Sequence, residues 1–293
     1  MKRRGLQDNI MEHNIGIAFS GGGMRGIAHI GILQALQEHG IHPDMVSGTS
    51  AGSIIGAMYA AGKTPEEMLD FVKTTSLFKV FKPGFPLNGL SSLTYLVERL
   101  QKYIEIDSFE ALEKTFYVYT TNLNSGEETR YQSGLLFDKI MASCAIPMVF
   151  KPVELNGNLH CDGGLVNNLP AKDLARHAKM VIGANVVPVE DRTNRSLDSM
   201  LGILSRMFEI VPNVNARSQA KYCDVIIEPK GLGDYHFFAL DQADKIFKKG
   251  YDAAIIQIPY ILKVMEVKGI EVNSEKLKLN SEKLRALEHG RHG

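Results

Sequence analysis

The chain has 293 residues, enough for one sizeable core, and its 44% hydrophobic and 23% charged residues are ordinary for a soluble globular protein. It contains 33 basic and 33 acidic residues, so its formal net charge is zero. This balance argues against nucleic-acid binding, because nucleic-acid-binding domains usually carry a basic excess. The spacing of Cys144, Cys161 and Cys223 fits neither a disulfide framework nor a zinc site, so we expect buried free thiols and no metal.

The first nine residues are basic but are not followed by an apolar segment, and no run of about 18 apolar residues occurs in the sequence. We therefore expect no signal peptide, no transmembrane helix and a cytoplasmic location. We expect a flexible segment over residues 1–13, a single domain over residues 14–268 and a charged tail over residues 269–293. Nothing in the sequence defines an oligomeric state.

Short apolar runs alternate along the chain with segments of helical periodicity. Strands are predicted at residues 15–20, 43–47, 116–121, 128–132, 180–187 and 225–227, and helices at residues 27–39, 64–73, 92–103, 137–144 and 241–264. An Asn-Gly pair at 156–157 predicts a hairpin between residues 148–155 and 158–161. This alternation predicts an α/β layered fold with a mainly parallel central sheet.

A glycine-rich loop follows the first predicted strand, where residues 20–26 read Ser-Gly-Gly-Gly-Met-Arg-Gly. This spacing matches dinucleotide-binding loops, with Asp44 as the candidate ribose ligand, whereas the Gly-Lys-Ser/Thr ending of a phosphate-binding loop is missing. The exposed amides of Gly21, Gly22 and Gly23 would also suit an oxyanion hole, which stabilises developing negative charge.

A candidate nucleophile lies in residues 48–52, which read Gly-Thr-Ser-Ala-Gly and join the second predicted strand to an apolar helix. At such a turn the hydroxyl of Ser50 is exposed, and the amides of the following helix can stabilise negative charge. A capping serine in a glycine-rich turn would give the same pattern. Both loops leave the carboxyl edge of a parallel sheet, so we expect them to be neighbours, which favours acyl transfer over nucleotide binding.

A nucleophilic serine needs a base. Asp162 is the candidate, because the two glycines after it let the chain turn sharply and leave the carboxylate accessible. His236 is the plausible base of a Ser-Asp-His triad, but Ser50 follows only two strands, too early for an α/β-hydrolase. We therefore favour a dyad of Ser50 and Asp162, with the triad as the alternative.

Three sequence blocks occur together and in the order found in one family. They are residues 20–26 followed by His-Ile-Gly at 29–31, residues 48–52, and Asp-Gly-Gly-Leu-Val-Asn-Asn-Leu-Pro at 162–170. A Ser-Cys-Ala-Ile-Pro segment at 143–147 fits the same pattern. Over about residues 14 to 190 the chain resembles the bacterial patatin-like phospholipases.

This resemblance implies a three-layer α/β/α fold and a lipid acyl hydrolase that cleaves carboxylic esters of phospholipid or lysophospholipid type through an acyl-enzyme. The implied site residues are Ser50 as nucleophile, Asp162 as base, and an oxyanion hole of Gly21, Gly22 and Gly23 with Arg25 beside them. No cofactor is implied. The expected partners are a lipid or ester substrate and, transiently, a membrane surface. The alternative from another class is a regulatory protein that keeps the fold but acts through a partner.

Three further features allow two interpretations each. Arg25 could hold negative charge or pair with a carboxylate, and His29 fits a packed helix histidine better than a catalytic one. The aromatic stretch over residues 78–85 fits a lid or membrane-touching loop as well as a core-capping segment. The apolar stripe over residues 197–208 fits an acyl groove or an ordinary core helix.

Overall fold

The structure of the protein is a computed structural model, which describes residues 13–75, 89–188, 191, 198, 200–233, 235 and 242–272. Several sequence-based predictions lie outside these residues. They concern the aromatic stretch over 78–85, His236, most of the flexible segment over 1–13 and most of the charged tail over 269–293.

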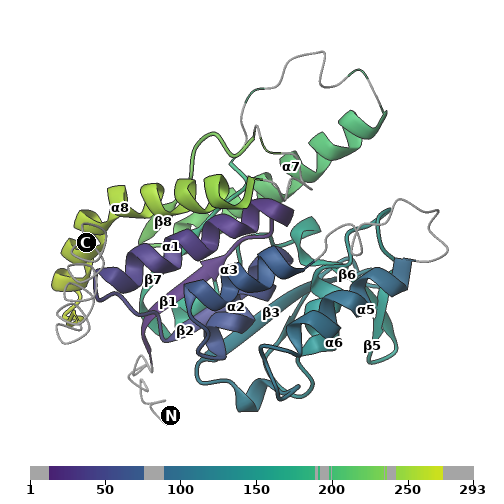
Figure 1. Cartoon of the computed structure of the whole chain (residues 1–293), viewed down its shortest axis with the longest axis horizontal. Helices are drawn as coiled ribbons and strands as arrows, with labels where there is room; N and C mark the ends of the chain where they lie inside the picture. The colour runs from purple at the N-terminus through teal and green to yellow at the C-terminus, as the bar shows by residue number, and fades with distance from the viewer. Residues whose placement is uncertain are drawn as a thin grey trace, which may run out of the picture.

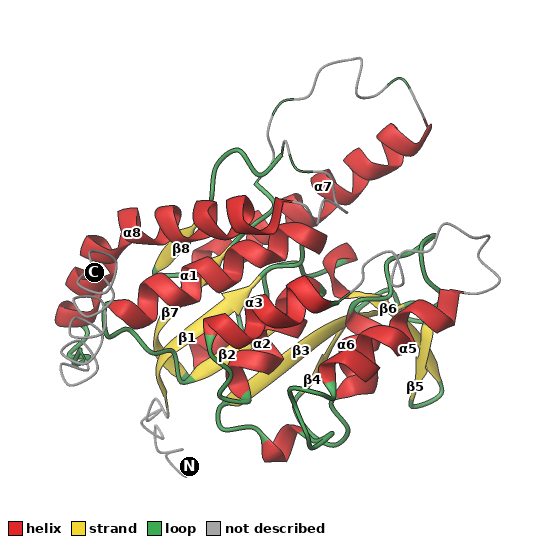
Figure 2. Ribbon diagram, viewed as in Figure 1, coloured by secondary structure: helices red, strands yellow, loops and turns green. Residues whose placement is uncertain are grey.

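A mixed eight-stranded sheet forms the centre of the molecule (Figure 2). Its strands are β1 (His13–Phe19), β2 (Met45–Thr49), β3 (Thr115–Asn122), β4 (Glu128–Tyr131), β5 (Val153–Leu155), β6 (Asn158–Asp162), β7 (Ala178–Ala184) and β8 (Val225–Ile227). The order is β5-β6-β3-β2-β1-β7-β8, with β4 paired to β3. The pairs among β3, β2, β1, β7 and β8 are parallel, and the pairs that involve β4, β5 or β6 are antiparallel. The predicted mainly parallel sheet is confirmed.

Helices flank the sheet in unequal layers (Figure 1). The thicker layer consists of α1 (Ile27–Glu38), α2 (Ala51–Ala60), α3 (Pro65–Thr74), α5 (Gly89–Leu100), α6 (Phe137–Ser143) and α8 (Ala243–Val267). The other face is covered by the short turns η4 (Gly163–Leu165) and η5 (Leu174–Arg176) and by the end of α7 (Met200–Gln219). On that face Leu174 and Ala216 pack in one cluster with Tyr117 and Val181. The three-layer α/β/α prediction is therefore confirmed.

Local sequence signals account for several element boundaries. The Thr64 side chain accepts a hydrogen bond from the Glu67 amide and the Glu67 side chain accepts one from the Thr64 amide, a capping box that begins α3. Asn156 and Gly157 both have positive φ, 52° and 76°, as the predicted hairpin turn requires. The hairpin is shorter than predicted, because Met148 with φ of 66° interrupts extended backbone before β5.

Helix ends near proline were predicted less well. From Met200 onward, the stripe over 197–208 lies in α7, which continues through Pro212 to Gln219. α8 likewise continues through Pro259 to Val267. In the described part of the chain, no helix combines the length and apolarity needed to cross a bilayer. Cys144 and Cys161 are buried and free, as predicted, whereas Cys223 is free but only partly buried.

Helices α1 and α8 cross closely because both present a glycine at the crossing. A Cβ atom added to Gly250 would collide with the carbonyl oxygen of Ala28, and one added to Gly31 would collide with that of Phe247. A glycine in the middle of a helix normally lowers stability relative to alanine. At this crossing the missing side chains are instead a condition for packing.

We predict that Gly250→Ala lowers the unfolding free energy by about 1–3 kcal/mol, because the helices must separate. An unhindered helical Gly→Ala change would raise it by about 0.5–1 kcal/mol, so the sign of the effect is diagnostic. Urea denaturation measures it. Ile256→Ala on the exposed side of α8 is the control, with a change within about 0.5 kcal/mol. A stabilised Gly250→Ala protein would contradict the close crossing.

Candidate active site

Ser50 occupies a strained turn between β2 and α2. Its backbone has φ of 52° and ψ of −124°, a conformation that non-glycine residues rarely adopt. Its amide donates to the hydroxyl of Ser143 (2.8 Å), and its carbonyl accepts from the amide (2.8 Å) and hydroxyl (2.6 Å) of Ser53. The turn is thus held from both sides, and Ser50 sits at the amino end of α2, where helix amides favour negative charge.

The two glycines around this turn are required by close packing. A Cβ atom on Gly48 would collide with the backbone of Gly52, and one on Gly52 would collide with the carbonyl oxygen of Phe19 at the end of β1. The Gly-x-Ser-x-Gly spacing therefore lets the serine turn press against the neighbouring strand.

The glycine-rich loop lies directly beside Ser50. β1 and β2 are parallel neighbours, with Phe19 opposite Gly48, so their following loops leave the same edge of the sheet. A Cβ atom on Gly21 would stand only 3.1 Å from the Cβ atom of Ser50. The Gly21 amide donates to the side-chain oxygen (3.1 Å) and the carbonyl oxygen (3.2 Å) of Asn168. Within the described residues, the amides of Gly22 and Gly23 have no hydrogen-bond partner.

Asp162 ends β6 and lies in the same cavity as Ser50. Gly21 and Gly22 line that cavity as well. The Asp162 carboxylate accepts a hydrogen bond from the Gly164 amide (2.8 Å) and is within hydrogen-bonding reach of the Ser50 hydroxyl. Burial raises the pKa of Asp162 to about 6, and the hydrogen bonds from Ser50 and Gly164 partly oppose this shift. The carboxyl is thereby a stronger base than an exposed aspartate and is still ionised at neutral pH.

A second, apolar cavity of about 110 Å³ begins at Ser50 and extends between the helices of the thick layer. Its wall includes Ile55, Val72, Leu96 and Phe150 from four segments of the chain. Ser50 therefore separates two environments, a polar one that holds Asp162 and an apolar one that could hold a hydrocarbon chain.

The side chain of Arg25 points to α7. Its guanidinium donates to the carboxylate of Glu209 at 2.6 Å, and both side chains are buried. Arg206 pairs with the other oxygen of Glu209 at 2.9 Å. Of the two interpretations of Arg25, this structure shows the carboxylate pairing, but the partner comes from α7 and not from its own neighbourhood in the sequence.

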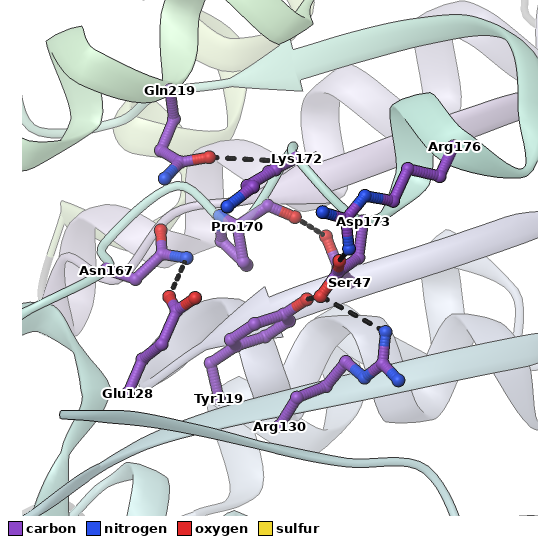
Figure 3. A network of polar contacts seen from close by, with 10 residues as sticks. All are labelled: Ser47, Tyr119, Glu128, Arg130, Asn167, Pro170, Lys172, Asp173, Arg176 and Gln219. Carbon is purple, nitrogen blue, oxygen red and sulfur yellow. Dashed lines mark hydrogen bonds and ion pairs between the residues drawn. The ribbon is translucent and has the colours of Figure 1, made fainter.

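A polar network anchors the chain that follows Asp162 (Figure 3). Asp173 accepts a hydrogen bond from the Tyr119 hydroxyl at 2.7 Å. The same carboxylate pairs with Arg130 (3.1 Å) on β4 and with Arg176 (2.9 Å). The Asp173 side chain thus fixes the end of the segment that follows Asp162 to strands β3 and β4.

Two further bonds in Figure 3 hold the beginning of the same segment. The Asn167 amide donates to Glu128 (2.6 Å), and the Ser47 hydroxyl donates to the carbonyl of Pro170 (2.6 Å). Because these residues follow the Asp-Gly-Gly turn within a few positions, the network positions the turn that carries the Asp162 carboxylate.

The interpretation of the glycine loop as a dinucleotide site required Asp44 as the ribose ligand, and this part of it is wrong. Asp44 accepts hydrogen bonds from the amides of Asn14 (3.1 Å) and Ile15 (3.0 Å), at the amino ends of β1 and β2. This is the opposite edge of the sheet from the loop at residues 21–26, so Asp44 cannot contact a ligand held there.

The described histidines have partners other than Ser50. His29 is fully buried, donates to the carbonyl of Ser20 (2.9 Å) and has its pKa lowered to about 4 by burial, as a packed helix histidine would. His160 contacts the hydroxyl of Thr120 (2.9 Å), and its pKa is lowered by burial. His177 lies before β7, at the edge of the sheet away from Ser50.

Three residues that contact the site were not singled out from the sequence, namely Asn168, Ser143 and Glu209. Asn168 and Ser143 lie inside the blocks at 162–170 and 143–147, so their polar side chains beside the candidate residues were an available signal. Glu209 had no signal, because it lies beyond the blocks in a helix that reads as an ordinary apolar stripe.

The family model for patatin-like phospholipases matches residues 17–175, more than half of the chain. The chain therefore belongs to the patatin-like phospholipase family.

Curated relatives match through a small part of their length. Lysophospholipase NTE1 of Eremothecium gossypii is 32% identical over 224 residues, which cover 71% of this chain and 14% of that protein. Patatin-like phospholipase domain-containing protein 6 of Mus musculus is 33% identical over 202 residues, which cover 65% of this chain and 15% of that protein. The chain thus spans less than a fifth of the length of either relative.

Solved structures share the fold. VipD from Legionella pneumophila superposes with a TM-score of 0.51 at 18% identity, over 95% of this chain and 75% of that one. Human GIVD cytosolic phospholipase A2, in complex with methyl gamma-linolenyl fluorophosphonate, gives a TM-score of 0.50 at 12% identity, over 91% and 60%.

We predict that Asp162→Asn stabilises the protein at neutral pH, by up to about 3 kcal/mol, because it removes the cost of burying a charge. The folded carboxyl loses its proton near pH 6, whereas the ordinary pKa of an aspartate carboxyl is 3.8. Between these values the wild-type unfolding free energy falls as pH rises. The advantage of the variant should therefore grow from about pH 4 to about pH 7 in urea denaturation. An equal difference at both pH values would contradict a raised pKa.

Proposed function

We propose that the chain is a serine acyl hydrolase that cleaves carboxylic esters of lipids, of phospholipid or lysophospholipid type, through a dyad of Ser50 and Asp162. The observation that supports it most is the meeting of the Ser50 hydroxyl, the Asp162 carboxyl and the glycine amides at one cavity. Membership of the family and the names of the relatives point the same way. The proposal includes a single catalytic domain over residues 14–268, bacterial affiliation and cytoplasmic location.

In the first half of the proposed reaction, the Ser50 Oγ attacks the carbonyl carbon of the ester while Asp162 accepts the hydroxyl proton. The free amides of Gly22 and Gly23 and the amino end of α2 donate to the developing oxyanion. The Gly21 amide contributes by holding the loop through Asn168. Arg25 adds positive charge near the loop, which Glu209 partly neutralises.

In the second half, the tetrahedral intermediate collapses to an acyl-enzyme, and the leaving alkoxide takes the proton from Asp162. Asp162 then removes a proton from water as the water attacks the acyl carbonyl, and the second tetrahedral intermediate collapses with cleavage of the bond to Ser50 Oγ. The departing Ser50 oxygen takes that proton back from Asp162, which releases the fatty acid and restores both residues. The apolar cavity beside Ser50 holds the hydrocarbon chain through both steps, because its walls are predominantly apolar and favour a hydrocarbon over water.

We predict that Ser50→Ala abolishes labelling by a fluorophosphonate probe and lowers kcat/KM for a p-nitrophenyl ester at least about 1,000-fold. Asp162→Asn should lower kcat/KM at least about 100-fold. In the wild type, kcat/KM should rise with pH through about 6 as Asp162 loses its proton.

The control for this experiment is Ser125→Ala in an exposed turn, which should behave as the wild type. Unchanged labelling and turnover in Ser50→Ala would refute the nucleophile. Retained activity in Asp162→Asn together with loss in His236→Ala would favour the triad over the dyad.

We also predict that Val72→Trp shortens the range of accepted acyl chains, because the indole fills the apolar cavity. The kcat/KM for a butyryl ester should stay within about threefold, whereas that for a dodecanoyl ester should fall at least about tenfold, since each buried methylene contributes about 0.8 kcal/mol. Val72→Ala is the control and should retain the long-chain substrate. Equal losses for both esters would place the acyl chain elsewhere.

A further inference from the structure

Helix α7 carries an exposed apolar face that the proposed reaction does not use. Its exposed residues are Ile203, Met207, Ile210, Val211 and Val214. Their spacing of three and four residues places them on one side of the helix. A neighbouring exposed apolar pair, Met148 and Val149, follows α6. We call these seven residues the α7 surface; each is between 37% and 76% exposed.

The opposite side of α7 is fixed to the candidate active site. Glu209 pairs with Arg25 of the glycine loop, and Asn213 donates to the carbonyl of Val187 (2.8 Å). Asn215 donates to the carbonyls of Gly164 (3.2 Å) and Leu165 (3.0 Å), next to Asp162. The exposed apolar face is therefore held in a defined orientation by polar contacts on the inner face.

Both parts of the α7 surface border the cavity that holds Ser50 and Asp162. Pro147, next to Met148, and Pro212, next to Val211, line that cavity. The amino-terminal part of α7 projects beyond the body of the molecule (Figure 1). A flat apolar phase that covered the α7 surface would thus lie at the mouth of the site.

The charges around this surface identify the occupant. Glu209 is the one acidic residue in the sequence of α7, and it is buried and paired with Arg25. Arg217 is exposed and lies three residues after Val214, and Lys221 is exposed just beyond the helix. Lys151 is exposed two residues after Val149. Exposed carboxylates lie further along the chain, at Asp198 before the amino end of α7 and at Glu154 after Lys151. The part of the apolar face nearest the site is thus bordered by three cations, which complement an anionic lipid surface.

We propose that the α7 surface docks the protein on an anionic lipid bilayer, with Met207 and Val214 inserted among the acyl chains and Arg217 at the headgroups. This inference rests on the proposed function, which supplies a lipid as the substrate. Docking would place the Ser50 cavity against the bilayer, so that an ester can enter without crossing water.

The experiment measures sedimentation with vesicles of phosphatidylcholine alone or mixed with phosphatidylglycerol. It uses Ser50→Ala protein, so that binding is measured without hydrolysis. Docking predicts stronger binding to the anionic vesicles. Met207→Glu with Val214→Glu should weaken binding at least about tenfold. Arg217→Gln should weaken it about fivefold, on anionic vesicles only and less at high salt.

Ile256→Glu is the matched control, since it places the same charge on an exposed apolar position of α8 and should leave binding unchanged. Thermal unfolding shows whether each variant is folded. When Ser50 is kept, the protein with Met207→Glu and Val214→Glu should hydrolyse a water-soluble ester at the wild-type rate but lose activity on vesicles. If no ester is hydrolysed while vesicle binding follows the prediction, the proposed function fails and the docking surface stands.

Three outcomes would overturn the docking proposal. One is wild-type-like vesicle binding by the double variant. The second is failure of the Ser50→Ala protein to bind either kind of vesicle. The third is a dimer in sedimentation velocity that the two glutamates dissociate, because the α7 surface would then bind a second copy of the chain.

Discussion

The close contact of two loops at the carboxyl edge of β1 and β2 is the constraint on which the rest of the site depends. Gly21 and Ser50 approach until a side chain on the former would touch Cβ of the latter, and Gly52 packs on the end of β1. Such an approach needs parallel neighbouring strands and residues without side chains. The approach places the backbone amides of the glycine loop beside the Ser50 hydroxyl, so that no side-chain hydrogen-bond donor is needed there.

Burial of Asp162 is the second determinant, and it has opposite effects on stability and chemistry. Removing a carboxylate from water costs free energy in the folded state and raises its pKa to about 6. The same shift makes the carboxyl a better proton acceptor. The turn that carries it is held by the Asp173 and Asn167 contacts to β3 and β4, which lie outside the cavity.

α7 links the site to the surface of the molecule. Its inner face contacts the glycine loop through Glu209 and the Asp162 turn through Asn215, while its outer face is apolar and exposed. One face of this helix therefore makes polar contacts with the protein, and the other can pack against an apolar phase.

The sequence by itself determined the order of the elements, the strand-to-helix turn at Ser50, the capping box of α3 and the hairpin at Asn156 and Gly157, because each depends on residues close together in the chain. It also brought out the three blocks that define the family. It predicted the hairpin of β5 and β6 but did not determine that β6 joins the sheet antiparallel to β3, nor that α7 continues through Pro212.

Only the tertiary structure decided which groups meet across long stretches of chain. Arg25 and Glu209 are 184 positions apart, and Gly21 and Asn168 are 147 apart. Periodicity reports which face of an element is apolar but not which residue of another element it will face. The partners of Arg25 and Asn168, and the displacement of Asp44 to the far edge of the sheet, follow from strand register and from burial, which arise only when the whole chain packs.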